Sequence, residues 1–244
     1  MAIAAESTLG NSTSVSANTL SLTNKTVSGT DRLLLVAVSG GLQSSGVTVT
    51  SITYGGEALT QLGTYFNYAS DGFRCSLWYK IAPKTDANQT LSVTISSTTY
   101  IAISAVNYTG VDQSTPFTTP TTTSDASSPA ALTDTSDRDG SWQIAFIGGT
   151  NGSIAVSSGG TTRQTHWAGY YLQTDSNATV ANGVSNTLNF TYSGGGLGMS
   201  AMMRPVVASA SNVKSADGVL QAKIKSADGL AIANIKNSSG VSNV

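Results

Sequence analysis

Hydrophobic and polar residues alternate along much of the chain, as they do in β-strands that bury one face. In residues 90–96 (TLSVTIS), three aliphatic side chains share one face and hydroxyl side chains occupy the other. The same period of two recurs in residues 73–81 (FRCSLWYKI) and 187–193 (TLNFTYS). Because successive side chains of a strand point to opposite faces, each segment is predicted to be a half-buried strand.

Other segments are more continuously apolar. Residues 32–38 (RLLLVAV) are predicted to lie in the middle of a sheet, buried on both faces. Residues 141–149 (SWQIAFIGG) and 197–206 (LGMSAMMRPV) supply later strands, and glycine-rich or Asp-Gly turns separate the segments. No segment carries a sustained apolar stripe at helical spacing. About ten strands of this kind predict an all-β, antiparallel sandwich or barrel.

Residues 115–136 (TPFTTPTTTSDASSPAALTDTS) interrupt this rhythm with three prolines and many hydroxyl side chains. They are predicted to form a long surface connection that crosses between the sheets of a Greek-key or jelly-roll sandwich. A domain boundary at this point is less favoured, because each half would have only a thin core. Residues 1–207 are therefore predicted to form one β-sandwich domain.

The composition changes after Pro205, and an eleven-residue phrase led by lysine is repeated in residues 208–244. Each repeat is predicted to be one short strand and a tight turn. The period also suits a right-handed helical coil, but a glycine and an aspartate in every repeat argue against a helix. So few strands cannot bury their apolar side chains alone. The tail is predicted to mediate attachment or oligomerisation through Leu220, Ile224, Leu230, Ile232 and Ile235; the alternative is a tail that folds back on its own sandwich.

The charge composition excludes several kinds of partner. Only 10% of the residues are charged and the net charge is −1, which argues against nucleic acid and against a basic membrane-binding patch. No run approaches the ~20 apolar residues that span a bilayer, so membrane insertion is not expected. The single cysteine, Cys75, is predicted to be a core residue. The first residues lack the features of a secretion signal, which leads us to expect assembly inside a cell.

Candidate catalytic and metal-binding residues are few. His166 is the only histidine, and neither a nucleophile motif nor an orienting carboxylate accompanies it. We therefore predict a surface histidine, no catalytic residue, no cofactor and no enzyme. Residues 133–140 (TDTSDRDG) partly match a calcium loop through Asp134, Asp137 and Asp139, but the closing glutamate is missing and a solvated turn is favoured.

Aromatic side chains suggest one possible ligand. Trp78, Trp167 and Tyr170 are candidates for a surface that stacks on sugar rings. Aromatic residues in alternating strands are more often core residues, and Trp78 is expected on the outer face of its strand. Sugar binding therefore remains a secondary hypothesis.

Four segments resemble a β-sandwich domain that recurs in bacterial surface proteins and phage structural proteins. They are residues 28–39 (SGTDRLLLVAVS), 49–63 (VTSITYGGEALTQLG), 76–83 (SLWYKIAP) and 107–117 (NYTGVDQSTPF). The resemblance implies a jelly-roll-like sandwich with a role in adhesion or assembly, and it provides no catalytic residues. That domain usually ends with a tryptophan in its last strand, whereas residues 199–203 here are methionine-rich.

The tail is similar to a narrower group. Residues 225–236 (KSADGLAIANIK) resemble the C-terminal repeats of phage virion proteins. Together the two resemblances imply a virion structural protein, such as a capsid decoration, head-fibre or tail-associated subunit. Its expected partners are further copies of itself, with a trimer favoured by the resemblance alone, and other capsid or tail proteins. The alternative is a carbohydrate-binding adhesion module at a bacterial surface, with cell-surface glycans as its partners.

Overall fold

The computed structural model describes residues 1–40, 47–67, 74–126, 130–149, 154–166, 171–192 and 196–207. The predicted tail lies outside the described residues, as do Trp167 and Tyr170. Strands are the only regular elements in these ranges: β1 (Ala4–Lys25), β2 (Leu33–Gly40), β3 (Val49–Tyr54), β4 (Glu57–Ala58), β5 (Thr60–Asn67), β6 (Arg74–Ile81), β7 (Gln89–Thr109), β8 (Thr121–Ala126), β9 (Ala130–Thr135), β10 (Trp142–Gly149), β11 (Ala155–Ser158), β12 (Thr161–His166), β13 (Tyr171–Asp175), β14 (Ser185–Thr191) and β15 (Gly196–Met203).

The strands form three antiparallel sheets. The largest has the order β4-β3-β7-β2-β6-β5, with β1 also paired to β7. The first half of β7 pairs with β3 and its second half pairs with β2, while β1 follows both halves. This arrangement curls the sheet into a nearly closed, barrel-like form. The second sheet has the order β12-β13-β10-β15-β8, and the third has the order β11-β14-β9.

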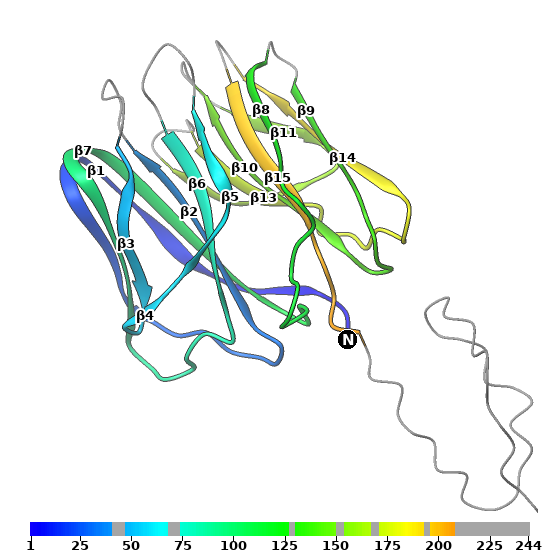
Figure 1. Cartoon of the computed structure of the whole chain (residues 1–244), viewed down its shortest axis with the longest axis horizontal. Coiled ribbons are helices and arrows are strands. Elements are labelled where there is room, and N and C mark those ends of the chain that lie inside the picture. The colour runs from blue at the N-terminus through cyan, green and yellow to red at the C-terminus, as the bar shows by residue number, and fades with distance from the viewer. Residues whose placement is uncertain are drawn as a thin grey trace, which may run out of the picture. The chain divides into compact units, whose positions relative to one another are not determined.

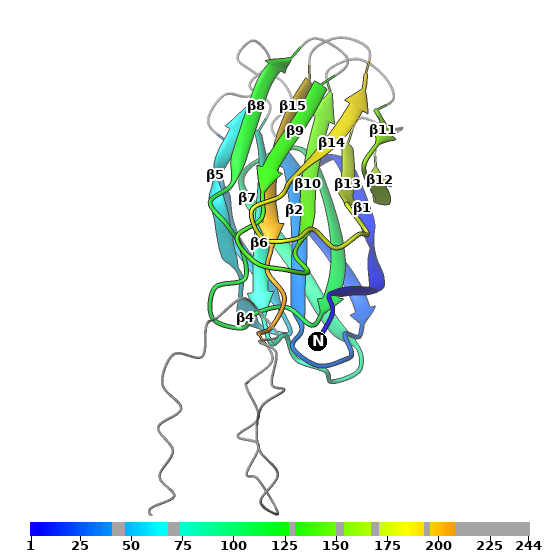
Figure 2. The ribbon, with the colours of Figure 1, turned by 90° about the vertical axis from the view of Figure 1, so that its right-hand side faces the viewer.

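The sheets are stacked in layers (Figures 1 and 2), and three hydrophobic cores lie between or inside them. The central core lies between the large sheet and the five-stranded sheet, and includes Leu35, Leu77, Phe146 and Met199. The barrel core fills the inside of the curled sheet, and includes Val36, Ile52, Leu91 and Ile103. The outer core joins the five-stranded and three-stranded sheets, and includes Leu132, Ile147, Leu188 and Phe190.

Strands in the inner layers are buried on both faces. Every residue of β2, β10 and β15 is buried. Alternate side chains of β2 and of β10 enter different cores, and one face of β15 enters the central core. This confirms the prediction for residues 32–38. The prediction that Leu91, Val93 and Ile95 are buried is also confirmed.

The all-β, antiparallel prediction is confirmed, but a simple two-sheet sandwich is not what the strands form. Residues 115–136 are not only a surface connection, because they contain β8 and β9. They do carry the chain from the five-stranded to the three-stranded sheet. The long strand β1 was not predicted, because its alternating positions are mostly hydroxyl-bearing rather than apolar.

The outer faces of the stack carry rows of hydroxyl side chains. On the large sheet, Thr19 Oγ1 lies 3.1 Å from Thr94 Oγ1, and Ser21 Oγ donates to Ser92 Oγ at 3.2 Å. On the three-stranded sheet, the Oγ1 atoms of Thr133 and Thr187 lie 2.8 Å apart. Such cross-strand hydroxyl pairs stabilise antiparallel sheets. They also give a polar surface to a chain with few charged residues.

Candidate functional site

A buried polar cluster interrupts the outer core between the five-stranded and three-stranded sheets. Its centre is the Asp134 carboxylate of β9, which accepts hydrogen bonds from hydroxyls on two strands of the opposite sheet. Ser200 Oγ donates to Asp134 Oδ2 at 2.5 Å, and Thr121 Oγ1 donates to Asp134 Oδ1. Asp134 is 7% exposed and Ser200 is fully buried. A carboxylate in such a place needs hydrogen-bond donors, and here all of them are neutral.

Gln143 of β10 completes the cluster. Its Nε2 donates to Asp134 Oδ2 at 2.6 Å and to the Leu132 carbonyl oxygen at 3.0 Å. Its Oε1 accepts a hydrogen bond from Asn186 Nδ2 at 2.8 Å. Both ends of the amide therefore have complementary partners. Asp134 Oδ2 contacts the Ser200 hydroxyl on one side and the Gln143 amide nitrogen on the other.

The strand registers explain why these residues meet. Ser200 of β15 is paired with Thr121 of β8 on one side and with Ala145 of β10 on the other, which makes Gln143 its diagonal neighbour. On the facing sheet, Asp134 is paired with Asn186 of β14. Residues that share a face in diagonal positions lie within reach of long side chains. The cluster therefore follows from the alternation of each strand.

A second buried carboxylate belongs to Asp175 of β13, which is fully buried. It accepts hydrogen bonds from Arg163 Nε at 2.6 Å and from Arg163 Nη2 at 2.9 Å, and Tyr108 Oη donates to it at 2.8 Å. Hydrogen bonding to Asp175 raises the pKa of Arg163, and burial raises the pKa of Tyr108 well above its usual value, with the Asp175 charge adding to it. This group fixes β12 and β13 against the large sheet.

A third polar group holds the place where the described chain ends. Arg204 forms an ion pair with Asp137, and its Nη1 donates to the carbonyl oxygens of Thr115 at 3.1 Å and Phe117 at 2.6 Å. Its backbone NH donates to the Pro116 carbonyl oxygen at 2.8 Å. Hydrogen bonding and charge from Arg204 lower the pKa of Asp137. We call this group the exit clamp.

The exit clamp extends to a neighbouring ion pair between Arg138 and Asp112. Burial pushes the pKa of Asp112 upward, but hydrogen bonds from Ser114, Thr115 and Arg138 outweigh this effect and hold that pKa far below its usual value. The Val206 backbone NH also donates to the Gly110 carbonyl oxygen at 2.9 Å. The last described residues are thus fixed by backbone and side-chain contacts together.

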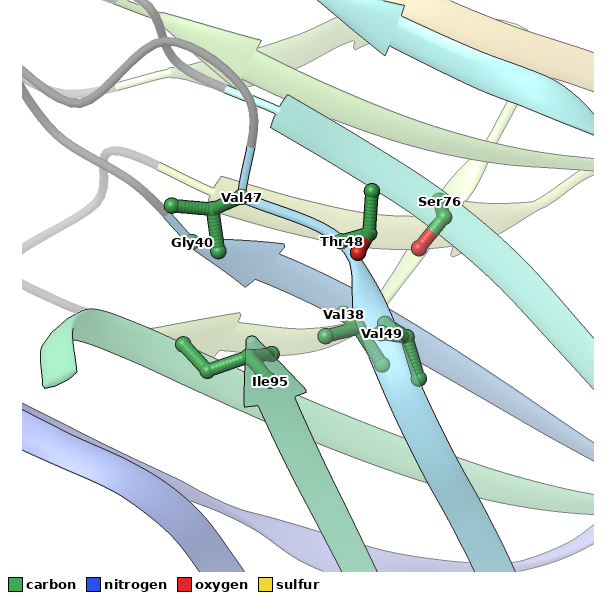
Figure 3. Close-up of a pocket in the computed structure, with 7 residues that line it drawn as sticks. All are labelled: Val38, Gly40, Val47, Thr48, Val49, Ser76 and Ile95. Atoms are coloured by element: carbon green, nitrogen blue, oxygen red, sulfur yellow. The ribbon is translucent and has the colours of Figure 1, made fainter. Parts of the chain in front are cut away.

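A small pocket lies at one end of the curled sheet (Figure 3). Thr48 and Ser76 are the only lining residues with polar side chains. The Ser76 hydroxyl already accepts a hydrogen bond from Trp78 Nε1 at 2.9 Å. The remaining lining residues are aliphatic or glycine: Val38, Gly40, Val47, Val49 and Ile95. The lining offers no acid, base or thiol for catalysis.

The predicted site residues that lie in the described ranges do not converge on one site. Asp134, Asp137 and Asp139 belong to different contacts, since Asp139 Oδ1 accepts from the Asn182 backbone NH at 2.8 Å. Within the described ranges, no three acidic, histidine or cysteine side chains are grouped to hold a metal ion. Trp78 is not fully on an outer face as expected, because it is half-buried against the barrel core. The backbone of His166 ends β12, where it is paired with Tyr171.

Sequence reasoning did not identify the Asp134 cluster as a unit. The signal was present as polar residues inside apolar strands, namely Gln143 in SWQIAFIGG and Ser200 in LGMSAMMRP. Polar side chains that are buried in such positions require partners. The partners could not be identified, because Asp134 was interpreted as part of a surface loop.

Comparisons with known proteins add no relative: no family model, curated protein or solved structure matches the chain. Among the described residues, no helix is long and apolar enough to cross a membrane.

Proposed function

We propose that this protein is a non-enzymatic structural subunit of a bacteriophage virion, with a jelly-roll-like β-sandwich that is displayed on the particle. Residues 208–244 would attach it to other copies of the chain or to capsid or tail proteins. In this role it would decorate the capsid or form part of a head fibre or tail. Its location would be the virion.

The observation that carries the proposal is the exit clamp. Arg204 contacts Asp137, Thr115 and Phe117 immediately before the repeat-bearing segment begins. Side-chain and backbone bonds thus hold the root of this segment to the sandwich. An attachment segment needs a fixed root if it is to position the domain that it carries. The sequence resemblances of the sandwich and of the repeats to phage structural proteins point the same way.

The test is to delete residues 208–244 and measure molar mass by light scattering and binding to source particles by co-sedimentation. All described strands precede this segment, so the truncated protein should keep its far-UV circular dichroism and unfold cooperatively. We expect it to be monomeric and to lose particle binding. Each large apolar side chain gains roughly 1.5–3 kcal/mol on full burial, so the tail has a driving force to pair.

A full-length control separates loss of the repeats' apolar contacts from loss of chain length. In this control Leu220, Ile224, Leu230, Ile232 and Ile235 are all replaced by serine, and it should behave like the deletion. If the truncated protein keeps the full-length oligomeric mass and still binds particles, the tail is not the attachment device.

The second candidate is a carbohydrate-binding module of a bacterial surface protein. It rests on the half-buried Trp78, and on the aromatic residues Trp167 and Tyr170 in the sequence. A glycan array with wild-type protein and Trp78→Ala distinguishes the two functions. Specific glycan binding that Trp78→Ala removes, without particle association, would favour the module over the virion subunit.

A further inference from the structure

We propose that Ser200 and Gln143 are joined by an intramolecular ester bond, which the protein forms by itself with Asp134 as the proton carrier. The proposal concerns a covalent modification within the domain and does not depend on the virion function. It rests on the three groups that the Asp134 cluster brings together: a hydroxyl, a carboxylate and a carboxamide.

The nucleophile and its base are in direct contact. Ser200 Oγ donates to Asp134 Oδ2 at 2.5 Å, which is the arrangement that lets a carboxylate take the hydroxyl proton as oxygen attacks. Ser200 Oγ also lies 3.5 Å from Gln143 Nε2, so the hydroxyl is next to the amide group. This contact is to the amide nitrogen, so for attack the hydroxyl oxygen must shift toward Cδ, the carbon bonded to that nitrogen.

The electrophile is held and polarised. Asn186 Nδ2 donates to Gln143 Oε1 at 2.8 Å, where negative charge would develop when the hydroxyl adds to the amide carbon. The nitrogen that must leave, Gln143 Nε2, lies 2.6 Å from the same Asp134 Oδ2 that contacts the hydroxyl. Asp134 Oδ2 can therefore accept the proton from the Ser200 hydroxyl and donate it to the leaving nitrogen of Gln143.

The reaction balances without any further reactant. Ser200 Oγ forms a bond to Gln143 Cδ while its proton passes to Asp134. The C–N bond of the tetrahedral intermediate then breaks, and the leaving nitrogen takes that proton and departs as ammonia. Nothing is oxidised or reduced, and Asp134 ends as it began. The reaction occurs once per chain, so it does not make the protein an enzyme.

Burial favours the product. Gln143 and Ser200 are both fully buried, which strengthens the hydrogen bonds of the cluster and shields an ester from hydrolysis. The ester would join the neighbouring strands β10 and β15, in the middle of the five-stranded sheet. Thr121 is not the nucleophile, because it donates to the other oxygen of Asp134 and contacts Ser200 at 3.3 Å instead of the amide.

Mass spectrometry of the purified full chain tests the proposal. We expect an intact mass below the sequence mass by one ammonia molecule. After trypsin digestion, fragment 139–163, which holds Gln143, should be joined to fragment 164–214, which holds Ser200. Peptide mapping is essential, because the Asn-Gly pairs at 151–152 and 182–183 can lose ammonia by forming a succinimide.

Three variants assign the roles. Ser200→Ala and Asp134→Asn should each show the full sequence mass and no joined fragment, while Thr121→Val should keep the cross-link. Near-UV circular dichroism checks that each variant is folded. If folded wild-type protein retains the full sequence mass after prolonged incubation, or if its ammonia loss maps only to the Asn-Gly pairs, the proposal is wrong.

The chain also contains a matched control pair. Ser104 Oγ donates to Gln173 Oε1 at 2.7 Å, and both residues are buried. Here the hydroxyl donates to the amide oxygen itself and not to a carboxylate that could accept its proton. Ser104→Ala should therefore leave the mass loss unchanged. A joined fragment that maps to Ser104 and Gln173 would show that buried serine–glutamine contact is sufficient, which would overturn the role given to Asp134.

Discussion

Asp175 and Asp134 are both buried carboxylates, but different kinds of partner offset the free-energy cost of burying them. Asp175 is paired with a guanidinium group through two hydrogen bonds. Asp134 is surrounded by Thr121, Gln143 and Ser200, which are all neutral donors. The guanidinium group balances the charge of Asp175 directly, whereas the partners of Asp134 carry no charge and only donate hydrogen bonds. Asp175 therefore belongs to a structural ion pair, whereas the Asp134 cluster is the one for which we propose a reaction.

The largest loss of stability is expected when the ion pair between Asp175 and Arg163 is broken. Arg163→Met removes the cation and leaves a buried carboxylate uncompensated, which should lower the free energy of unfolding by about 3–5 kcal/mol. Urea unfolding monitored by circular dichroism measures it. Replacing the exposed Lys84 with methionine is the control and should change stability little. An Arg163→Met protein as stable as the wild type would show that the pair does not anchor β12 and β13.

A smaller loss of stability is expected when Asp134 is replaced in a protein that cannot form the ester. In a Ser200→Ala background, adding Asp134→Asn should cost roughly 1–3 kcal/mol, because the new amide offers a donor to partners that are themselves donors. Urea unfolding of the single and double variants isolates this contribution. A cost equal to that of Arg163→Met would mean that neutral donors matter as much as the guanidinium group.

The smallest effect is a change in acid sensitivity at the exit clamp. The folded-state pKa of Asp112 lies below the ordinary value of 3.8, so its contribution to stability is complete above that value and is lost as the pH falls toward the folded pKa. We expect Asp112→Asn to flatten the acid side of the stability curve below about pH 4. The exposed Asp86→Asn is the control. An unchanged acid slope in Asp112→Asn would contradict the assignment.

The sequence predicted the strands well where apolar residues set the pattern. Leu33 to Val36, in the segment predicted to be buried on both faces, are buried. Tyr79, in the predicted strand 73–81, is only half-buried, because it packs at the margin of the central core against Phe117. Periodicity shows whether a face is apolar, but it does not show what covers that face.

The layered arrangement and the Asp134 cluster therefore could not be derived from the sequence. Gln143 and Ser200 looked like isolated polar residues in apolar strands, and the register that makes them neighbours depends on long-range pairing. Asp134 was assigned to a solvated turn because only local spacing was visible. The strand β1 was not predicted, because it has too few buried apolar residues to mark a buried face. Leu9 and Leu22 are two of them.

The position of β15 has a mechanical consequence. All eight of its residues pair with β10, part of its other edge pairs with β8, and the exit clamp follows it directly. Antiparallel hydrogen bonds run perpendicular to their strands. A pull on residue 207 along the axis of β15 would therefore load these bonds in shear, all at once, instead of opening them one by one. Residue 207 thus follows a strand that would resist such a pull along its whole length.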